Sequence, residues 1–260
     1  MYTIKDIMEK LDELAPIILA ESWDNVGILV GDTKQKVTKI MCALDVDRAV
    51  LQEAVRENVD CIVTHHPFIF GAIKKVDYTT PIGHGIKTLI QNNISLISMH
   101  TNLDSAAGGI NDIICEGLGI TDTRVLADPT NCEPQEGLGR YGQINSMPLN
   151  KFIEKVKQYF GIQYVRVVGD LKDDITSVSV CSGSGSSFIG EASRVSQVYI
   201  TGDVKFHEAQ DALSKGLAII DVGHYASEQI VVPKLKNYLQ QYLDIPVICT
   251  GVNGEVFRTL

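Results

Sequence analysis

Short apolar runs alternate with helix-patterned stretches along most of the chain. Apolar runs at residues 40–44, 61–63 and 94–98 are separated by stretches in which polar and apolar residues alternate with a helical period. Short buried strands that alternate with helices are typical of parallel β-α-β units. Residues 105–119 then predict a further helix that ends at Gly119, since glycine commonly ends helices. The first half therefore predicts an α/β lobe.

The same alternation starts again after a stretch rich in Pro, Gly and Asn at residues 128–142. The elements predicted there are strands at 164–168, 178–181, 197–200, 217–222 and 246–249, and helices at 149–160, 205–214 and 227–242. We therefore predict two similar α/β lobes, residues 1–125 and 126–260, with mostly parallel sheets. The pattern leaves open whether the last strand returns to the first lobe.

Composition narrows the class of protein. With 45% hydrophobic and 21% charged residues, the chain is typical of globular proteins. A formal net charge of −9 opposes general nucleic-acid binding. We find neither an uninterrupted apolar run of about 18 residues nor a secretory signal, so we expect a soluble cytoplasmic protein and no membrane span. Six scattered cysteines without a Cys-x-x-Cys pair are expected to be reduced core residues: Cys42, Cys61, Cys115, Cys132, Cys181 and Cys249.

Three polar clusters follow predicted strands. They are Thr64-His65-His66-Pro67, His100-Thr101-Asn102-Leu103-Asp104 and Gly223-His224-Tyr225-Ala226-Ser227-Glu228. Sites in open parallel sheets form beyond the carboxyl ends of the strands, where side chains from several crossovers converge. His224 and Glu228 are four residues apart at a predicted helix start, so they share one helix face.

These clusters supply more ligands than one metal ion needs. Three or four imidazoles and two carboxylates exceed the set for a tetrahedral ion with an open position. A single histidine at a strand end is more often a hydrogen-bonded structural residue, but three clusters at strand ends favour a two-metal site. Nitrogen and oxygen ligands suit Zn, Mn, Fe, Co or Ni. Two divalent ions about 3.5–4 Å apart can hold a bridging hydroxide as nucleophile.

Five ordered motifs resemble the GTP cyclohydrolase I type 2 homolog family, also called Nif-three-like. They are the three clusters above, Ser22-Trp23-Asp24-Asn25-Val26-Gly27, and Thr201-Gly202-Asp203 with His207. The resemblance spans nearly the whole chain and fits the short form without the family's inserted domain. It implies a dinuclear metal site in the cleft between the lobes, with Glu228 as the bridging ligand, and a ring-shaped homohexamer. The implied metal ligands are His65, His66, Asp104, His224 and Glu228.

Other residues have two interpretations each. Asp203 and His207 are four apart at a strand-to-helix junction, so they could share a face and support ligands or transfer protons, or Asp203 could simply cap the helix. His100 could orient a ligand or relay protons, whereas His84 is expected at the surface. Residues 181–187, rich in Ser and Gly, fit a tight turn better than an anion site. Trp23 and Asp24 could line the cleft, but a single Trp is more often packing.

The leading functional hypothesis is a metal-dependent hydrolase that uses metal-bound hydroxide. Its substrate would be a nucleotide or another small heterocyclic or phosphorylated compound, with His207, His100 and Asp203 as the catalytic candidates. The alternative is a non-catalytic, ring-shaped metal-binding carrier, regulator or scaffold. An open coordination position distinguishes the two, because catalysis requires one and storage does not. In a third hypothesis, nucleic acid passes through the ring, and only the ring architecture supports this hypothesis.

Overall fold

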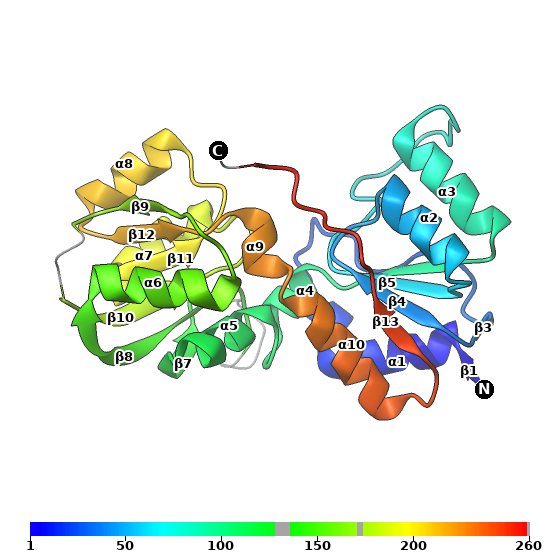
Figure 1. Ribbon diagram of the computed structural model, residues 1–260, viewed down its shortest axis with the longest axis horizontal. Helices are drawn as coiled ribbons and strands as arrows, with labels where there is room; N and C mark the ends of the chain where they lie inside the picture. Colours follow the sequence, from blue (N-terminus) through cyan, green and yellow to red (C-terminus); the bar gives the residue numbers. More distant parts are fainter. Residues whose placement is uncertain (128–135, 171–173, 259–260) are drawn as a thin grey trace. The chain divides into compact units, whose positions relative to one another are not determined.

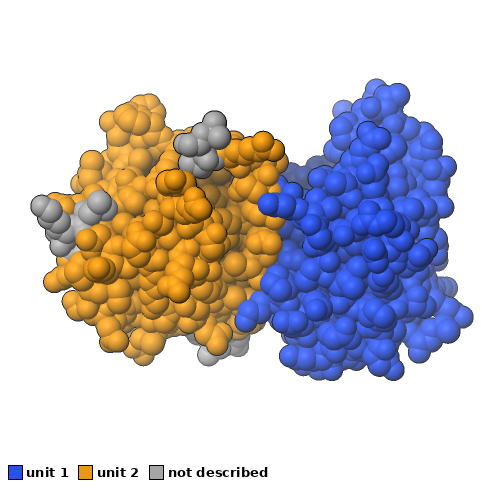
Figure 2. All heavy atoms as spheres, viewed as in Figure 1, with its two compact units in different colours: residues 1–103, 231–254 blue, residues 104–230, 255–260 orange. Residues whose placement is uncertain are grey.

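The chain forms two compact units. The computed structural model describes residues 1–127, 136–170 and 174–258. Unit 1 comprises residues 1–103 and 231–254, and unit 2 comprises residues 104–230 and 255–260 (Figure 2). This division differs from the expected halves, 1–125 and 126–260. The chain enters unit 2 at Asp104 and returns to unit 1 at Val231.

The sheet of unit 1 has the order β13-β4-β5-β6-β2. Its strands are β2 (Gly27–Val30), β4 (Ile40–Ala43), β5 (Cys61–Thr64), β6 (Ser95–Ser98) and β13 (Val247–Cys249). β13, β4, β5 and β6 are parallel neighbours, and β2 runs antiparallel to β6. The last strand therefore returns to the first sheet. Because β4, β5 and β6 are parallel, the residues that follow them lie at one edge of the sheet.

Four helices cover this sheet. They are α1 (Ile4–Leu14), α2 (Arg48–Arg56), α3 (Pro81–Gln91) and α10 (Val231–Tyr242). Figure 1 shows α2 and α3 on one face and α1 and α10 on the other. Because both faces are covered, the central strands β4, β5 and β6 are buried along their whole length, and Met41, Ile62 and Leu96 have no exposed surface. The remaining elements are β1 (Tyr2–Thr3), β3 (Lys36–Val37) and the 3-10 turn η1 (Ile17–Leu19).

The sheet of unit 2 is mixed, with the order β7-β8-β10-β11-β12-β9. Its strands are β7 (Thr121–Val125), β8 (Arg140–Pro148), β9 (Arg166–Val168), β10 (Asp174–Val180), β11 (Val198–Thr201) and β12 (Ala218–Asp221). β10, β11 and β12 are parallel, whereas β8, β9 and β7 each pair antiparallel with their neighbour. The predicted fold class, two α/β lobes, is confirmed. Unit 2 has three parallel strands at the centre of its sheet and antiparallel strands on both sides of them, so parallel pairing predominates in unit 1 only.

The helices of unit 2 pack in pairs, α5 with α6 and α7 with α8. The bounds are α5 (Ile110–Leu118), α6 (Leu149–Phe160), α7 (Ile189–Val195) and α8 (Phe206–Ser214). The short helices α4 (Thr101–Ser105) and α9 (His224–Glu228) precede longer ones, and η2 (Ser186–Phe188) leads into α7. α5 packs on β7, β8 and β10, which explains why residues 104–125 belong to unit 2 rather than to the first half.

Two predicted helices are interrupted. The helix predicted over 105–119 is divided because Gly108 has a φ of 73° and Gly109 caps a new helix, α5. Gly119, with a φ of 64°, ends α5 as predicted. The helix predicted over 227–242 is likewise two helices, α9 and α10. These interruptions matter because α4 and α9 carry candidate metal ligands.

The described cysteines fit the predicted core role. Cys42, Cys61, Cys115 and Cys181 are buried thiols, and Cys249 is half-buried. Burial raises the pKa of both Cys115 and Cys181 to about 12, so these thiols stay protonated at neutral pH. Cys132 lies outside the described residues. In the part of the chain that the structure describes, no helix has both the length and the apolar character needed to cross a bilayer.

Candidate metal centre

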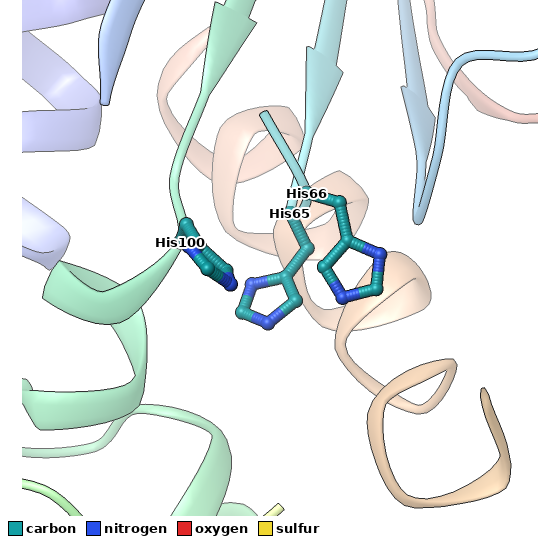
Figure 3. A group of neighbouring side chains, drawn as sticks. All are labelled: His65, His66 and His100. Carbon is teal, nitrogen blue, oxygen red and sulfur yellow. The ribbon is translucent and has the colours of Figure 1, made fainter. Parts of the chain in front are cut away.

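Three imidazoles lie together in unit 1. His65 and His66 follow β5, and His100 follows the neighbouring parallel strand β6. Figure 3 shows the three rings side by side, and one ligand nitrogen from each lies within 4.8 Å of the other two. The ring centroids are 5.1 to 5.6 Å apart. This group can hold a metal ion, and it includes His100, which sequence reasoning had not placed among the ligands.

Each ring of this group has its Nδ1 atom next to an oxygen. The contacts join His65 to the carbonyl oxygen of Met99 at 2.8 Å, His66 to Asp45 Oδ1 at 2.8 Å, and His100 to Asp24 Oδ1 at 2.9 Å. Carbonyl and carboxylate oxygens only accept hydrogen bonds, so Nδ1 must carry the proton. A neutral imidazole then offers its lone pair at Nε2. This is the arrangement found around histidines that bind metals.

Asp24 fixes the position of His100. Its carboxylate has no exposed surface and accepts hydrogen bonds from His100 and from the Thr101 amide and hydroxyl, the last two at 3.0 and 2.5 Å. Burial alone would raise the pKa of the Asp24 carboxyl, but the hydrogen bonds from His100 and Thr101 outweigh it and hold that pKa well below its usual range. Asp24 is therefore an anion at neutral pH.

His224 and Glu228 face each other on α9 in unit 2. Their Nε2 and Oε2 atoms are 3.0 Å apart, and Nδ1 of His224 lies 2.7 Å from Asp203 Oδ2. The prediction that both side chains share one helix face is confirmed. A neutral imidazole has one N–H, so two carboxylate neighbours require either a second proton or a cation. The 3.0 Å separation is close to the edge, about 3.3 Å, of a tetrahedron with metal–ligand bonds of about 2.0–2.1 Å.

Two glycines let the strand-end loops approach this pair. Gly183, with a φ of 65°, lies so close that a Cβ there would be 2.1 Å from Glu228 Oε1 and 3.4 Å from His224 Nε2. A Cβ on Gly202 would be 2.6 Å from the carbonyl oxygen of Gly183 and 2.7 Å from the amide of His224. The absence of side chains at both positions therefore leaves room for the Glu228 carboxylate.

Asp104 belongs to the same region of unit 2. Its carbonyl accepts a hydrogen bond from the Asn111 amide at 3.1 Å, and Asn111 in turn accepts one from the Ser182 backbone at 3.0 Å. Beyond the effect of burial, the charges of both Asp104 and Glu228 raise the pKa of the Cys181 thiol. The two carboxylates therefore lie in the same region of unit 2, near Cys181. Unit 2 thus carries three predicted ligands, and unit 1 carries the other two, His65 and His66.

Asp203 and His207 do not share a helix face. Helix α8 begins at Phe206 with Lys205 as its N-cap, so Asp203 lies outside the helix and caps nothing there. Asp203 has a φ of 56° and contacts His224 instead. His207 is exposed, and its Nδ1 contacts Gln210 Oε1 at 3.0 Å. Asp203 therefore lies beside a candidate ligand, whereas His207 contacts a neighbour on its own helix.

The Ser- and Gly-rich segment at residues 181–187 is a tight turn. Its amides at Ser182, Gly183 and Gly185 donate to the side chains of Asn111, Ser227 and Thr201, at 2.9 to 3.0 Å. Amides used in this way cannot bind an anion, and the α-helix that follows η2 has only seven residues. The turn interpretation is therefore favoured over the phosphate interpretation. His84 is exposed in the first turn of α3, as expected.

Sequence reasoning missed the groups that support the ligands. Asp45 lies just past β4, where a polar residue after a buried strand could have drawn attention to it. Asn111 lies on the buried face of α5, and a buried amide in an apolar helix face was a second available signal. Gly183 gave no signal, because its role depends on how close Glu228 comes to it.

Removing the Asp203 carboxylate is expected to weaken metal binding. Loss of a group that orients a metal-ligating imidazole typically costs about 10–100-fold in affinity, so Asp203→Gly should raise the dissociation constant for Zn²⁺ at least about tenfold. Glycine suits the left-handed backbone at this position. Asp203→Asn keeps an oxygen acceptor and should lose less. A competition titration with a chelating dye measures both values, and equal affinities in Asp203→Gly and wild type would contradict the supporting role.

Together, the fold and these groups define a class: an α/β protein of two units whose imidazoles and carboxylates can hold a metal ion. The sequence model of the Duf34/NIF3 (NGG1p interacting factor 3) family matches residues 2–254. The chain therefore belongs to this family, as the resemblance of its motifs predicts.

Relatives and solved structures agree with this assignment. A Clostridium acetobutylicum protein named GTP cyclohydrolase 1 type 2 homolog is 39% identical over 262 aligned residues, which cover 98% of each chain. A Clostridium perfringens protein of the same name is 35% identical over 246 residues, 94% of each chain. The crystal structure of the Staphylococcus aureus hypothetical protein SA1388 superposes with a TM-score of 0.89 at 29% identity, covering 99% of both chains.

Proposed function

We propose that this protein is a metal-dependent hydrolase with a dinuclear site formed by His65, His66, Asp104, His224 and Glu228. Its substrate class is a nucleotide or another small heterocyclic or phosphorylated compound. The relatives' name, GTP cyclohydrolase 1 type 2 homolog, makes GTP the first compound to test. A six-subunit ring in the cytoplasm is part of the same proposal.

The main support for the proposal is a hydrogen-bonding arrangement that four histidines have in common. His65, His66, His100 and His224 each have Nδ1 within 2.9 Å of a carbonyl or carboxylate oxygen. The acceptors belong to four separate chain segments, and each contact places a proton on Nδ1 and directs Nε2 away from it. Nothing in packing alone requires that coincidence, whereas metal coordination through Nε2 does.

The course of the chain supports a site shared by both units. Asp104 is the first residue of unit 2 and follows His100 by four positions, and Glu228 lies just before the return to unit 1 at Val231. Both chain crossings thus carry a candidate ligand within a few residues. We propose that the donors of the two units bind the same pair of ions. Glu228, with one oxygen next to His224, is the bridging ligand in this proposal.

The remaining residues have defined tasks in the proposed reaction. Two divalent ions held there would lower the pKa of a water molecule and polarise a carbonyl, phosphoryl or ring C=N group of the substrate. Asp203 and Asp24 orient His224 and His100 through their carboxylates. His100 either joins the ligands or moves a proton at Nε2, and its Nδ1 proton stays on the Asp24 side. His207 is an exposed candidate for proton transfer to the leaving group.

A turnover screen tests the proposal. Protein with a measured content of Zn²⁺ or Mn²⁺ is incubated with GTP, other nucleoside triphosphates and simple phosphoesters, and the products are separated by chromatography. Turnover that disappears with Glu228→Gln is the expected result. A fully metal-loaded protein that converts none of these compounds would favour the alternative, a metal-binding carrier or scaffold.

A further inference from the structure

Two large aromatic side chains lie exposed beside the imidazoles of unit 1. Trp23 is 56% exposed and Phe70 is 54% exposed, and their ring centroids are 5.9 Å apart at an angle of 45°. Each ring also meets His100 edge-on, at 6.3 and 6.4 Å. Because more than half of the Trp23 surface lies outside the core, its exposure fits a residue that lines a site better than a packing residue.

The backbone that carries these rings is held in place on both sides. Next to Trp23, the Asp24 carboxylate is bound to His100 and Thr101, and Thr101 also accepts a hydrogen bond from the Glu21 amide at 2.9 Å. The Asn25 side chain donates to the carbonyl oxygen of Ile69, the residue before Phe70, at 2.5 Å. The two aromatic rings thus belong to connected turns rather than to independent loops.

This arrangement combines two exposed aromatic rings, inclined to each other, with a polar edge. Aromatic rings bind other planar rings by stacking, which works with any planar π-face. His100 supplies a polar group at the border of the surface, next to His65 and His66. Small-molecule sites commonly have this composition, with apolar and aromatic walls and a few polar groups that fix orientation. An aliphatic or purely phosphorylated compound would make no use of two exposed rings.

We propose that Trp23 and Phe70 form a stacking platform that binds the planar heterocyclic ring of the substrate, such as a purine base, beside the candidate metal centre. This inference rests on the proposed function and narrows its substrate class to compounds with a planar heterocycle. Asp24 and Asn25 act as positioning residues, because they tie the two turns to β6 and to the segment after β5.

The chain offers a direct reporter, because Trp23 is its one tryptophan. Metal-stripped wild-type protein is titrated with guanosine 5′-monophosphate while tryptophan emission is recorded, with excitation at the red edge of the absorption band. Saturable quenching is expected. Ribose 5-phosphate, which has the sugar and the phosphate without the base, should cause none.

Variants separate stacking from other contacts. Phe70→Ala should weaken binding at least about fivefold, the lower limit for loss of one stacking ring. Phe70→Leu keeps apolar surface without a π-face and should weaken binding similarly. Tyr164→Ala removes an aromatic residue of unit 2 that is also more than half exposed, and this variant should bind like the wild type.

Three results would overturn the platform: no saturable quenching, equal quenching by ribose 5-phosphate, or unchanged affinity in both Phe70 variants. Because the titration uses metal-free protein, it is independent of turnover. Base-specific binding without any turnover in the metal-loaded protein would contradict the hydrolase proposal alone. Turnover of nucleotides without a loss of affinity in Phe70→Ala would contradict the platform alone.

Discussion

Glu228→Gln is expected to remove most of the bound metal. The side chain is only 3% exposed, and one carboxylate oxygen lies 3.0 Å from His224 Nε2. Glutamine keeps the shape but has no charge to offset that of a divalent ion, and a bridging ligand serves both ions. The loss of metal affinity should exceed the range of about 10–100-fold that is typical for groups that only support a ligand.

Two controls make the result specific to this position. Glu154→Gln makes the same chemical change on an exposed glutamate of α6, and His84→Ala removes an exposed imidazole of α3. Both should keep the metal content of the wild type, measured as ions per chain by elemental analysis. Equal metal content in Glu228→Gln and these controls would show that the site is misplaced.

Asp24→Ala is expected to lower the free energy of unfolding by about 3 kcal/mol. The substitution leaves the Thr101 amide, the Thr101 hydroxyl and the His100 Nδ1–H without their acceptor, and each unsatisfied buried donor costs about 1–3 kcal/mol. Urea unfolding followed by Trp23 emission measures the change within unit 1. Asp244→Ala, at an exposed acidic residue just before β13, is the control and should change stability little.

The effect of Asp24 should depend on pH in a defined direction. The hydrogen bonds from His100 and Thr101 hold the folded-state pKa of Asp24 below the value of about 3.9 for an unfolded chain. Its stabilisation is therefore fully present above about pH 4 and is lost as the pH falls through the folded-state pKa. The difference in stability between wild type and Asp24→Ala should shrink below pH 4. A difference that grows on acidification would contradict this.

Local patterns predicted much of the fold. The run Cys61-Ile62-Val63 followed by two histidines predicted β5 and its polar end, and the four-residue spacing of His224 and Glu228 predicted their common helix face. Gly119 ends its helix as predicted, because glycine tolerates the left-handed backbone found there. Such features depend on a few neighbouring residues, so one sequence is sufficient to predict them.

Features that depend on distant parts of the chain were not predictable. The border between the units lies at Asp104 rather than near residue 125, because β7 pairs with β8 and α5 packs beside α6. The contact of Asp203 with His224 required a turn with positive φ in place of the expected helix start. The fit of Gly183 against Glu228 is likewise a tertiary contact.

The candidate site was likewise predictable only in part. Histidines and carboxylates were visible as residue types after strands, but their orientation was not. Asp24 had been noted only as a residue that could line the site, and its fully buried carboxylate proves to fix His100. Orientation is set by hydrogen-bond partners that lie far away in sequence, as with Asp45 and His66.

The most direct test of metal binding is elemental analysis of the wild-type protein, purified without a metal-affinity tag and without added chelator. About two divalent ions per chain are expected, as for a site with five ligands and a bridging carboxylate. The same measurement identifies the metal among Zn, Mn, Fe, Co and Ni. A protein that contains no stoichiometric metal, and takes up none when these ions are supplied, would contradict the proposed centre and the hydrolase mechanism that depends on it.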